Sequence, residues 1–389
     1  MHGIKAAIVE AALAAGAGAV RFAPAAFDRA TFERMQSSFE RGDLATWAYG
    51  EPYAQRAASP GALLADAQSV VCLAVAYAAP PPPGRAPLSG RVSVYAWGED
   101  YHGRLRRVAH AVAEEIDRIA GAPSTHVVCD TAPLAERAFA AMAGLGWVGK
   151  HTNLIAAGLG SYVFLAEIVT TLRLEPDAPL KKTCGACTRC VDACPTRALR
   201  GDYTIDATRC IADLTQRTDD IPVAWRPFVG DWVWGCDLCQ EVCPPTRLAG
   251  SQPASARGPS APEEAFPDLQ RLLRLRSSEF KRRYRRRALG WRGAAVLRRN
   301  AAVALGNSLD RSAVEALEVS LATDPHAMVR GHAAWALGRL GSPRALASLR
   351  LRRGAEADAR VRGEIDRALA SWETFGMEAP LTPRRNLPK

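Results

Sequence analysis

Apolar runs of strand length recur through the first half of the chain. They cover residues 69–77, 125–130 and 161–169. Runs of this length and composition are typical of buried strands. Segments with helical spacing lie between them, and such alternation is the pattern of an α/β fold. The sequence therefore predicts an α/β domain over residues 1–172.

The helical spacing of apolar side chains is clearest in residues 101–121. This segment ends at Gly121, and glycine is the commonest residue just past the end of a helix. Residues 133–146 predict a second helix closed by glycine, and the alanine-rich stretch 1–20 predicts an amphipathic first helix. The proline-rich stretch 79–90 has the composition of a surface loop.

The second half of the chain changes in character. Residues 173–250 carry most of the cysteines and leave little room for a conventional core. Residues 250–267 are rich in Gly, Pro, Ser and Ala, which is the composition of a linker. Residues 268–375 have a helical pattern, and residues 376–389 form a tail. We expect a multidomain protein of mixed α/β and α+β class, with an N-terminal α/β domain, a cysteine-rich domain and an α-helical C-terminal domain.

A repeat runs through the helical part of the chain. Equivalent segments begin at Arg298, Arg330 and Arg362, and leucines recur at the same spacing. The pattern resembles a HEAT-type helical repeat. Stacked helix pairs form an extended surface suited to long ligands, although a plain helical cap on the preceding domain is the alternative.

Positive charge is concentrated near the start of this helical part. The chain has a formal net charge of +10, and residues 271–300 contain twelve Lys or Arg against a single acidic residue, Glu279. Such focusing favours a polyanionic partner. A solvated basic helix face is the alternative.

Neither a membrane span nor an export signal is expected. The sequence has no uncharged apolar run of 18 or more residues. Its N-terminus lacks the basic segment and clean apolar block of a signal peptide. Since clustered cysteines without an export signal favour metal binding over disulfides, we expect a cytoplasmic protein.

Eight of the ten cysteines lie between Cys184 and Cys243. The run that begins at Cys184 has the spacing C-x2-C-x2-C-x3-C-P of bacterial ferredoxins, in which the fourth cysteine serves the other cluster. A second run ends at Cys243 and lacks its first cysteine, which Cys210 can supply. We therefore predict a ferredoxin-like domain with two [4Fe–4S] clusters, and two zinc sites are the alternative. One ligand set is Cys184, Cys187, Cys190 and Cys243, and the other is Cys194, Cys210, Cys236 and Cys239.

The two remaining cysteines, Cys72 and Cys129, lie in apolar strand patterns and are expected to be small buried hydrophobes. The chain contains neither G-x-G-x-x-G after a strand nor G-x-x-x-x-G-K-[ST]. Two clusters relay electrons, so the first domain is expected to bind a redox group other than a nucleotide.

Several motifs together resemble the epoxyqueuosine reductase family. They are RVSVYAWGEDYHGRL at 91–105, DTAPLAERAFAAMAGLGWVGKHTNLI at 130–155, the ferredoxin run, RCIADLT at 209–215 and GCDLCQEVCP at 235–244. The resemblance implies cobalamin beside two [4Fe–4S] clusters. It also implies the last step of queuosine biosynthesis, the reduction of epoxyqueuosine to queuosine at the wobble position of tRNA.

The resemblance assigns the proton donor to Asp130. The departing epoxide oxygen needs a proton, and a carboxylic acid at the end of an apolar strand is expected to have a raised pKa. An N-cap on the following helix is the alternative role. Arg137 and Lys150 are candidates for phosphate binding. The implied cobalamin contacts are Arg56, Tyr95, Asp130, Asn153, Thr215 and Asp237.

The resemblance further implies tRNA as the partner, bound by its anticodon stem-loop through phosphate contacts. Arg282, Arg283, Arg285 and Arg286 of the basic segment are the expected contacts. An external low-potential electron donor and a monomeric enzyme are also expected. The alternatives are a related cobalamin and iron–sulfur reductase of small molecules, similar to reductive dehalogenases, or a non-catalytic electron-transfer or RNA-binding protein.

Overall fold

A computed structural model describes residues 2–250 and 261–375. Contacts within the chain group it into two compact units, each built from separate segments. The first unit comprises residues 1–80, 100–208 and 237–257, and the second comprises residues 81–99, 209–236 and 258–389. The domain boundaries drawn from sequence stay a prediction. Most of the predicted linker 250–267 and all of the predicted tail 376–389 lie outside the described residues.

The first unit is a mixed α and β structure. Its strands are β1 (Ala19–Pro24), β2 (Ser69–Ala76), β4 (Thr125–Val128), β5 (Gly146–Val148), β6 (Leu154–Ala156) and β7 (Val163–Thr170). Its helices are α1 (His2–Ala15), α2 (Arg29–Glu40), α3 (Glu51–Ala57), α4 (Tyr101–Ala120), α5 (Glu136–Met142), α6 (Arg189–Ala193), α9 (Leu238–Glu241) and α10 (Pro244–Gly250), with the 3₁₀ turn η1 (Pro60–Ala62).

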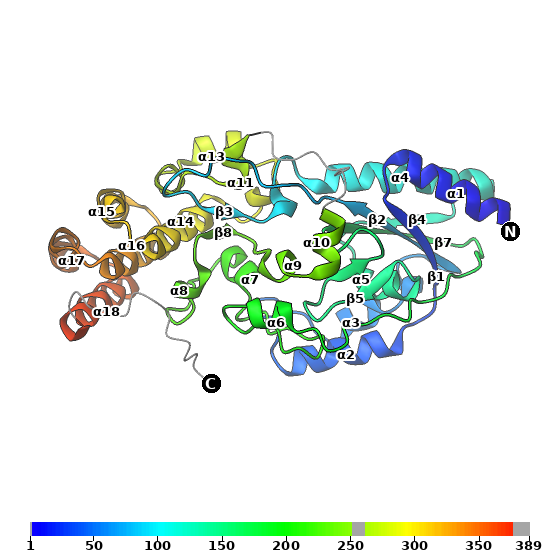
Figure 1. Ribbon diagram of the computed structural model, residues 1–389, viewed down its shortest axis with the longest axis horizontal. Coiled ribbons are helices and arrows are strands. Elements are labelled where there is room, and N and C mark those ends of the chain that lie inside the picture. Colours follow the sequence, from blue (N-terminus) through cyan, green and yellow to red (C-terminus); the bar gives the residue numbers. More distant parts are fainter. Residues whose placement is uncertain (1, 251–260, 376–389) are drawn as a thin grey trace. The chain divides into compact units, whose positions relative to one another are not determined.

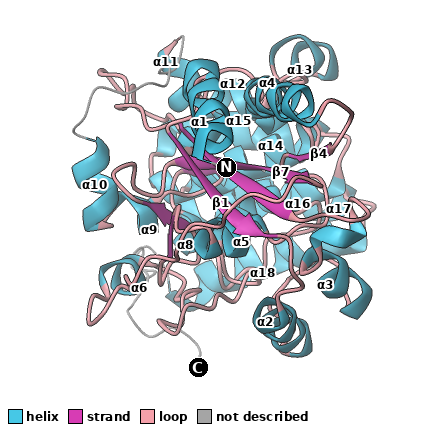
Figure 2. Ribbon diagram, turned by 90° about the vertical axis from the view of Figure 1, so that its right-hand side faces the viewer, coloured by secondary structure: helices cyan, strands magenta, loops and turns pink. Residues whose placement is uncertain are grey.

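Four strands form the main sheet in the order β1-β2-β7-β4, and every neighbouring pair is antiparallel. β5 and β6 form a separate antiparallel pair. The apolar runs that predicted strands correspond to β2, β4 and β7, so these predictions are confirmed. Figure 2 shows the sheet with α1 and α4 on one side and α5 on the other.

Side chains alternate between the two faces of each strand, and both faces of this sheet are buried. Val71 and Ile168 pack with Ile116 of α4 on one face. Cys72 packs with Phe139 of α5 on the other. Cys72 is therefore a core residue, as predicted, and Cys129 is 4% exposed.

Local sequence explains both ends of α4. The side chain of Asp100 caps its N-terminus by accepting a hydrogen bond from the His102 N–H. Gly121 ends it in the left-handed conformation with φ of 74°, which glycine adopts without strain. The predicted helix over 133–146 is shorter than expected, because α5 begins only at Glu136. The N-cap position belongs to Ala135, so the alternative role of Asp130 as the cap is wrong.

The second unit is mainly helical. Its two strands, β3 (Arg91–Val92) and β8 (Trp232–Trp234), pair in parallel. Its helices are α7 (Ile211–Gln216), α8 (Arg226–Val229), α11 (Pro262–Ala265), α12 (Leu269–Leu273), α13 (Ser277–Arg283), α14 (Ala294–Ser308), α15 (Val314–Thr323), α16 (Ala327–Leu340), α17 (Pro343–Ala355) and α18 (Ala359–Phe375), with the 3₁₀ turns η2 (Val94–Ala96), η3 (Ala288–Gly290) and η4 (Arg311–Ala313).

The predicted repeat is a stack of helices in which α14, α16 and α18 lie side by side (Figure 1). The recurring arginines hold this stack together. Arg298 donates to the carboxylate of Asp324, and Arg330 donates to the carboxylate of Glu356. Arg362 donates to the backbone oxygen of Glu356. The repeat arginines therefore join successive helices to the turns between them.

Candidate active site and cluster ligands

Asp130 lies in a turn two residues after β4, with φ of 62°. Residues other than glycine rarely adopt this left-handed conformation, but aspartate is one that tolerates it. The hydroxyl of Tyr101 donates a hydrogen bond to the Asp130 carboxylate. The Asp130 side chain is 54% exposed, so the apolar enclosure expected from sequence is not found. Polar partners and solvent, rather than burial, surround this carboxyl group.

His102 is a second partner of Asp130. Its Nε2 lies 3.3 Å from Oδ2 of Asp130, and its Nδ1 lies 2.6 Å from Oδ1 of Asp100. The imidazole thus lies between two carboxylates, and a ring protonated on both nitrogens donates to both. Because α4 starts at Tyr101, its first turn presents this phenol and imidazole to the turn after β4.

The turn is also held through its backbone. The Asp130 N–H donates to Oε1 of Glu136 over 2.7 Å. The Ala135 N–H donates to the backbone oxygen of Ala57, the last residue of α3, over 2.8 Å. α3 carries Arg56, so these bonds bring Arg56 and Asp130 into one neighbourhood.

Three aromatic rings of the first unit form a ladder. Trp47 stacks on Tyr49, with 6.1 Å between centroids, and Tyr49 stacks on Tyr53, with 4.2 Å. Trp47 is 39% and Tyr49 is 41% exposed. Burial, together with Tyr49 and the carboxyls of Glu136 and Asp130, raises the pKa of the Tyr53 phenol. The inner end of the ladder is therefore close to the Asp130 turn.

The loop 149–153 connects this region to the cysteines. Arg137 of α5 donates to the backbone oxygen of Thr152, beside Asn153, over 2.9 Å. Nζ of Lys150 donates to the backbone oxygen of Gly185 over 2.9 Å, and its backbone N–H lies 3.4 Å from Sγ of Cys184. Both side chains therefore bind backbone oxygens in this structure. The roles of Arg137 and Lys150 as phosphate ligands stay predictions.

The first predicted set of cluster ligands lies within the first unit. α6 and α9, which carry or flank these cysteines, pack against each other. Burial and the nearby thiols of Cys184 and Cys243 raise the pKa of the Cys190 thiol to about 11. The Cys187 N–H donates to the backbone oxygen of Cys184. The structure therefore gathers thiols that are distant in sequence, as the interlocked ferredoxin pattern requires.

The second set of ligands, Cys194, Cys210, Cys236 and Cys239, stays a prediction. The Ala198 N–H points at Sγ of Cys194 over 3.3 Å. Over residues 2–250 and 261–375, no three Cys, His, Asp or Glu side chains are gathered as for a single metal ion. A [4Fe–4S] cluster is larger than a single metal ion, and its four thiolate ligands bind it at separate points.

Three residues expected to contact cobalamin hold local structure. The buried Thr215 hydroxyl accepts from the Gly235 N–H, and the Tyr95 hydroxyl accepts from Nε1 of Trp234. The buried Asp237 carboxylate accepts from the Gln240 amide over 3.1 Å. The contacts of these three residues with cobalamin stay predictions.

The other predicted cobalamin ligands differ from these three. Arg56 is exposed and Asn153 is half-buried. Neither side chain makes a hydrogen bond within the described part of the chain. Nearby, His151 is buried, and no described residue bonds its Nε2. Burial lowers the pKa of His151 to about 4, so the imidazole is neutral at physiological pH. Arg56, Asn153 and His151 therefore have polar side-chain atoms that no described residue bonds, and the contacts of Arg56 and Asn153 with cobalamin stay predictions.

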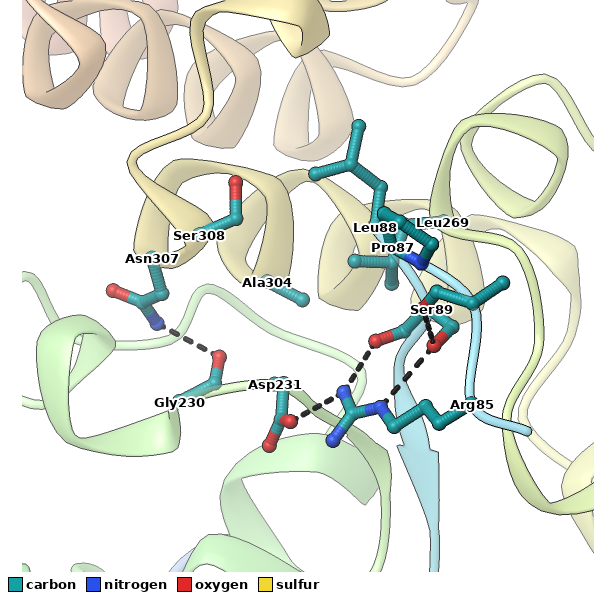
Figure 3. A pocket seen from close by; sticks show the side chains of 11 residues that line it. Arg85, Pro87, Leu88, Ser89, Gly230, Asp231, Leu269, Ala304, Asn307 and Ser308 are labelled. Atoms are coloured by element: carbon teal, nitrogen blue, oxygen red, sulfur yellow. Dashed lines mark hydrogen bonds and ion pairs between the residues drawn. The ribbon is translucent and has the colours of Figure 1, made fainter. Parts of the chain in front are cut away.

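A separate pocket of about 650 Å³ lies in the second unit (Figure 3). Arg85 from the proline-rich loop spans it and donates to Asp231 and to the backbone oxygen of Ser89. Asn307 of α14 closes another side by donating to the backbone oxygen of Gly230. None of the predicted site residues lines this pocket, and its polar groups mainly bind one another.

The structure divides the basic segment into two groups. Arg271 and Arg283 share the carboxylate of Glu279, and Arg299 is fully buried against backbone oxygens. Arg282, Arg285 and Arg286 are exposed, as is Lys281. Of the four predicted tRNA contacts, Arg283 is therefore already paired, and the other three present their charge to solvent.

Sequence reasoning missed Tyr101, His102, Glu136 and Glu167 as site residues. The signals were weak but present. Glu136 lies within the DTAPLAER motif, and Glu167 is a single acid inside an apolar strand run.

Over the described residues, no helix is long and apolar enough to cross a membrane.

Comparison with protein families matches three models. Residues 57–131 match "Epoxyqueuosine reductase QueG, DUF1730", residues 183–246 match "4Fe-4S double cluster binding domain", and residues 293–370 match "HEAT repeats". The second range contains all eight clustered cysteines. The iron–sulfur prediction is confirmed, and the zinc alternative is not supported.

Curated relatives and solved structures agree. An epoxyqueuosine reductase from Lactococcus garvieae is 40% identical over 261 residues, covering 66% of this chain and 74% of that protein. A crystal structure of epoxyqueuosine reductase with an epoxyqueuosine-modified tRNA-Tyr stem loop has a TM-score of 0.88 at 32% identity, covering 95% of this chain and 98% of that one.

A Bacillus subtilis epoxyqueuosine reductase structure, described with its catalytic aspartate loop swung out of the active site, also has a TM-score of 0.88 at 32% identity and covers 95% of this chain and 99% of that one. Three findings agree: the fold, the match to the double-cluster model, and the sequence identity to these relatives over most of the chain. The chain belongs to the epoxyqueuosine reductase family.

Proposed function

We propose that this protein reduces epoxyqueuosine in tRNA to queuosine, with cobalamin as the reacting group and two [4Fe–4S] clusters as the electron relay. One observation carries the proposal. The Asp130 carboxyl, held by Tyr101 and His102, lies on a turn that is tied through α5 and the loop 149–153 to the cluster ligand Cys184. A proton donor and an electron source are thus connected within one unit.

The cofactor would be held by side chains that the fold leaves available. Arg56 and Asn153 are the proposed contacts, since neither makes a hydrogen bond within the described residues. Cobalamin would supply a redox-active cobalt centre for reduction of the carbon–oxygen bond. The cluster cysteines would hold the electron relay, since the reduction potentials of iron–sulfur clusters extend down to about −700 mV.

The chain's own residues manage protons. Converting the epoxide to an alkene consumes two electrons and two protons and releases water. The carboxyl of Asp130 is the proposed donor to the departing oxygen. His102, placed between Asp130 and the half-exposed Asp100, provides a route by which solvent returns a proton to Asp130.

Two surfaces support tRNA as the substrate carrier. Arg282, Arg285 and Arg286 offer exposed charge to phosphates, which gives a grip that does not depend on base identity. The exposed rings of Trp47 and Tyr49 suit unpaired anticodon-loop bases, because RNA loops are recognised largely by stacking. A tRNA substrate and clusters that need a reducing environment favour a cytoplasmic location, where we expect a monomer served by an external low-potential donor.

The test is single-turnover reduction of epoxyqueuosine-containing tRNA by anaerobic protein loaded with iron, sulfide and cobalamin. Asp130→Asn keeps the size and the turn conformation of the residue but cannot donate the same proton. Its rate should fall by about a hundredfold or more, the usual effect of losing a general acid. Asp66→Asn is the matched control, since Asp66 is also an exposed aspartate of positive φ, 58°. Equal rates for both variants would contradict the role of Asp130.

A further inference from the structure

A carboxyl group is buried in the middle of the main sheet. Glu167 lies on β7, between Cys72 of β2 and Val128 of β4. Its exposure is 0%, and neither side-chain oxygen has a hydrogen-bond partner in the described chain. An ionised carboxylate without donors is strongly disfavoured in such a place. Burial, followed by the nearby Glu136 carboxyl, accordingly raises the pKa of Glu167 well above its usual range.

Glu136 approaches this group from the first turn of α5, on the face of the sheet that α5 covers. The two carboxyls lie close enough to influence each other's pKa, and burial raises the pKa of Glu136 to about 7 despite the bond from the Asp130 N–H. Two carboxyls this close do not both ionise at neutral pH, so the pair retains a proton. Glu167, the more deeply buried member, is the one that keeps it.

The surroundings of the pair offer little compensating charge. Among the described residues, the titratable groups that face it are Cys72 on β2, Cys129 after β4, Asp130 in the turn, Tyr53 on α3 and Arg137 on α5. Arg137 is the cation of this set, and its guanidinium already donates to the backbone oxygen of Thr152. The protonation of the pair therefore depends mainly on the two carboxyls themselves.

We propose, building on the function above, that Glu136 is a positioning residue that latches the Asp130 turn through its backbone N–H, and that Glu167 is the buried acid that holds Glu136 in place. The geometry supports a latch, because Oε1 of Glu136 accepts the Asp130 N–H over 2.7 Å while the Glu136 carboxyl lies near enough to the buried Glu167 to raise its pKa. Asp130 adopts a strained φ of 62°, which needs such support. In the Bacillus subtilis relative, the catalytic aspartate loop is described as swung out of the active site, so in that protein the loop leaves its place.

The latch has a pH dependence of defined sign. Above about pH 7 the Glu136 carboxylate is ionised and accepts the Asp130 N–H as a charge-assisted bond. Below that pH it is a neutral and weaker acceptor. The turn should therefore be held more tightly as the pH rises through the raised pKa of Glu136.

Amide hydrogen exchange of the loaded enzyme tests the latch without relying on turnover. In Glu136→Ala, exchange of the peptide spanning 129–135 should rise about tenfold or more relative to wild type at pH 8, as expected for a lost hydrogen bond. Glu136→Gln retains an acceptor, so its exchange should rise less and lose the change near pH 7. The control is Glu114→Gln, an exposed acid on α4, which should match wild type.

Turnover and infrared spectra complete the test. Glu136→Ala should lower kcat more than it changes KM, since substrate contacts remain. The carbonyl band of a protonated carboxyl should disappear in Glu167→Gln, which preserves size. Unchanged exchange in Glu136→Ala and Glu136→Gln would overturn the latch, and an unchanged band in Glu167→Gln would overturn the buried acid. If wild type itself fails to reduce epoxyqueuosine-tRNA, the proposed function fails, while the exchange and infrared results still decide this inference.

Discussion

The carboxylate of Glu136 accepts a hydrogen bond from the backbone N–H of Asp130, with 2.7 Å between Oε1 and N. This contact joins the first turn of α5 to the turn that carries the proposed proton donor. It also connects the donor to the sheet core, where Glu167 lies. The position of one exposed carboxyl thus depends on two acids that sequence motifs alone do not single out.

The imidazole of His102 should matter for proton return. We expect His102→Gln to lower turnover by about tenfold to a hundredfold, since it removes a proton route but leaves Asp130 and Tyr101 in place. The measurement is the pH profile of steady-state reduction, with His110→Gln, an exposed histidine of α4, as control. If both profiles coincide with wild type, His102 has no part in proton transfer.

Iron content should distinguish cluster cysteines from core cysteines. Cys184→Ala removes a ligand from the first predicted set, so about half of the bound iron should be lost. Cys72→Ala is the control, because Cys72 is a core residue of the sheet and should leave the iron content intact. Full iron retention in Cys184→Ala would contradict the ligand assignment.

The exposed charges of the basic segment should act on binding, whereas its buried arginines should act on stability. Replacing Arg282, Arg285 and Arg286 together by Gln should weaken stem-loop binding and flatten its salt dependence by roughly 0.7 per lost phosphate contact. Arg298→Gln is the contrasting variant. It leaves the buried Asp324 without its ion-pair partner, which should lower the stability by about 3 kcal/mol. Binding titrations measure the first effect and thermal unfolding measures the second. Normal stem-loop binding by the triple variant, or normal stability of Arg298→Gln, would contradict these roles.

The exposed aromatic ladder should contribute to RNA affinity. Trp47→Ala should weaken binding of an anticodon stem-loop by about 1–3 kcal/mol, the usual contribution of a stacked base. Quenching of tryptophan fluorescence on titration provides the assay. Trp291→Ala, an exposed tryptophan of the second unit, serves as comparison. Equal affinity of the Trp47 variant and wild type would remove the ladder from the binding surface.

The repeat stack should weaken in acid. Burial alone would raise the pKa of Glu356, but hydrogen bonds from Arg330, the Asp358 N–H and Arg352 lower it to about 2. Since the folded-state pKa lies below the ordinary value of 4.5, this stabilisation is present above pH 4.5 and lost as pH falls towards 2. Denaturant unfolding of wild type and Glu356→Gln should converge at low pH, and a constant difference would contradict this.

The sequence predicted what depends on local pattern. The strands β2 and β7, the helix α4 with its glycine cap and the clustered cysteines all follow from periodicity or spacing over a few residues. Such signals survive in any tertiary context that buries the same face.

What the sequence did not predict depends on contacts between distant residues. The partnership of His102 with Asp130 exists only because α4 packs beside β4. A count of charges could not tell that Arg299 is buried or that Arg283 is neutralised by Glu279. Glu167 lies in an apolar run, where its burial became visible only with α5 covering that face.

The most direct test of the central claim is nucleoside analysis of epoxyqueuosine-containing tRNA after incubation with the anaerobic, cobalamin-loaded enzyme and a low-potential reductant. The account predicts that epoxyqueuosine loses one oxygen atom and is converted to queuosine, and that omitting cobalamin prevents the conversion. Unchanged epoxyqueuosine with protein that carries both clusters and cobalamin would contradict it.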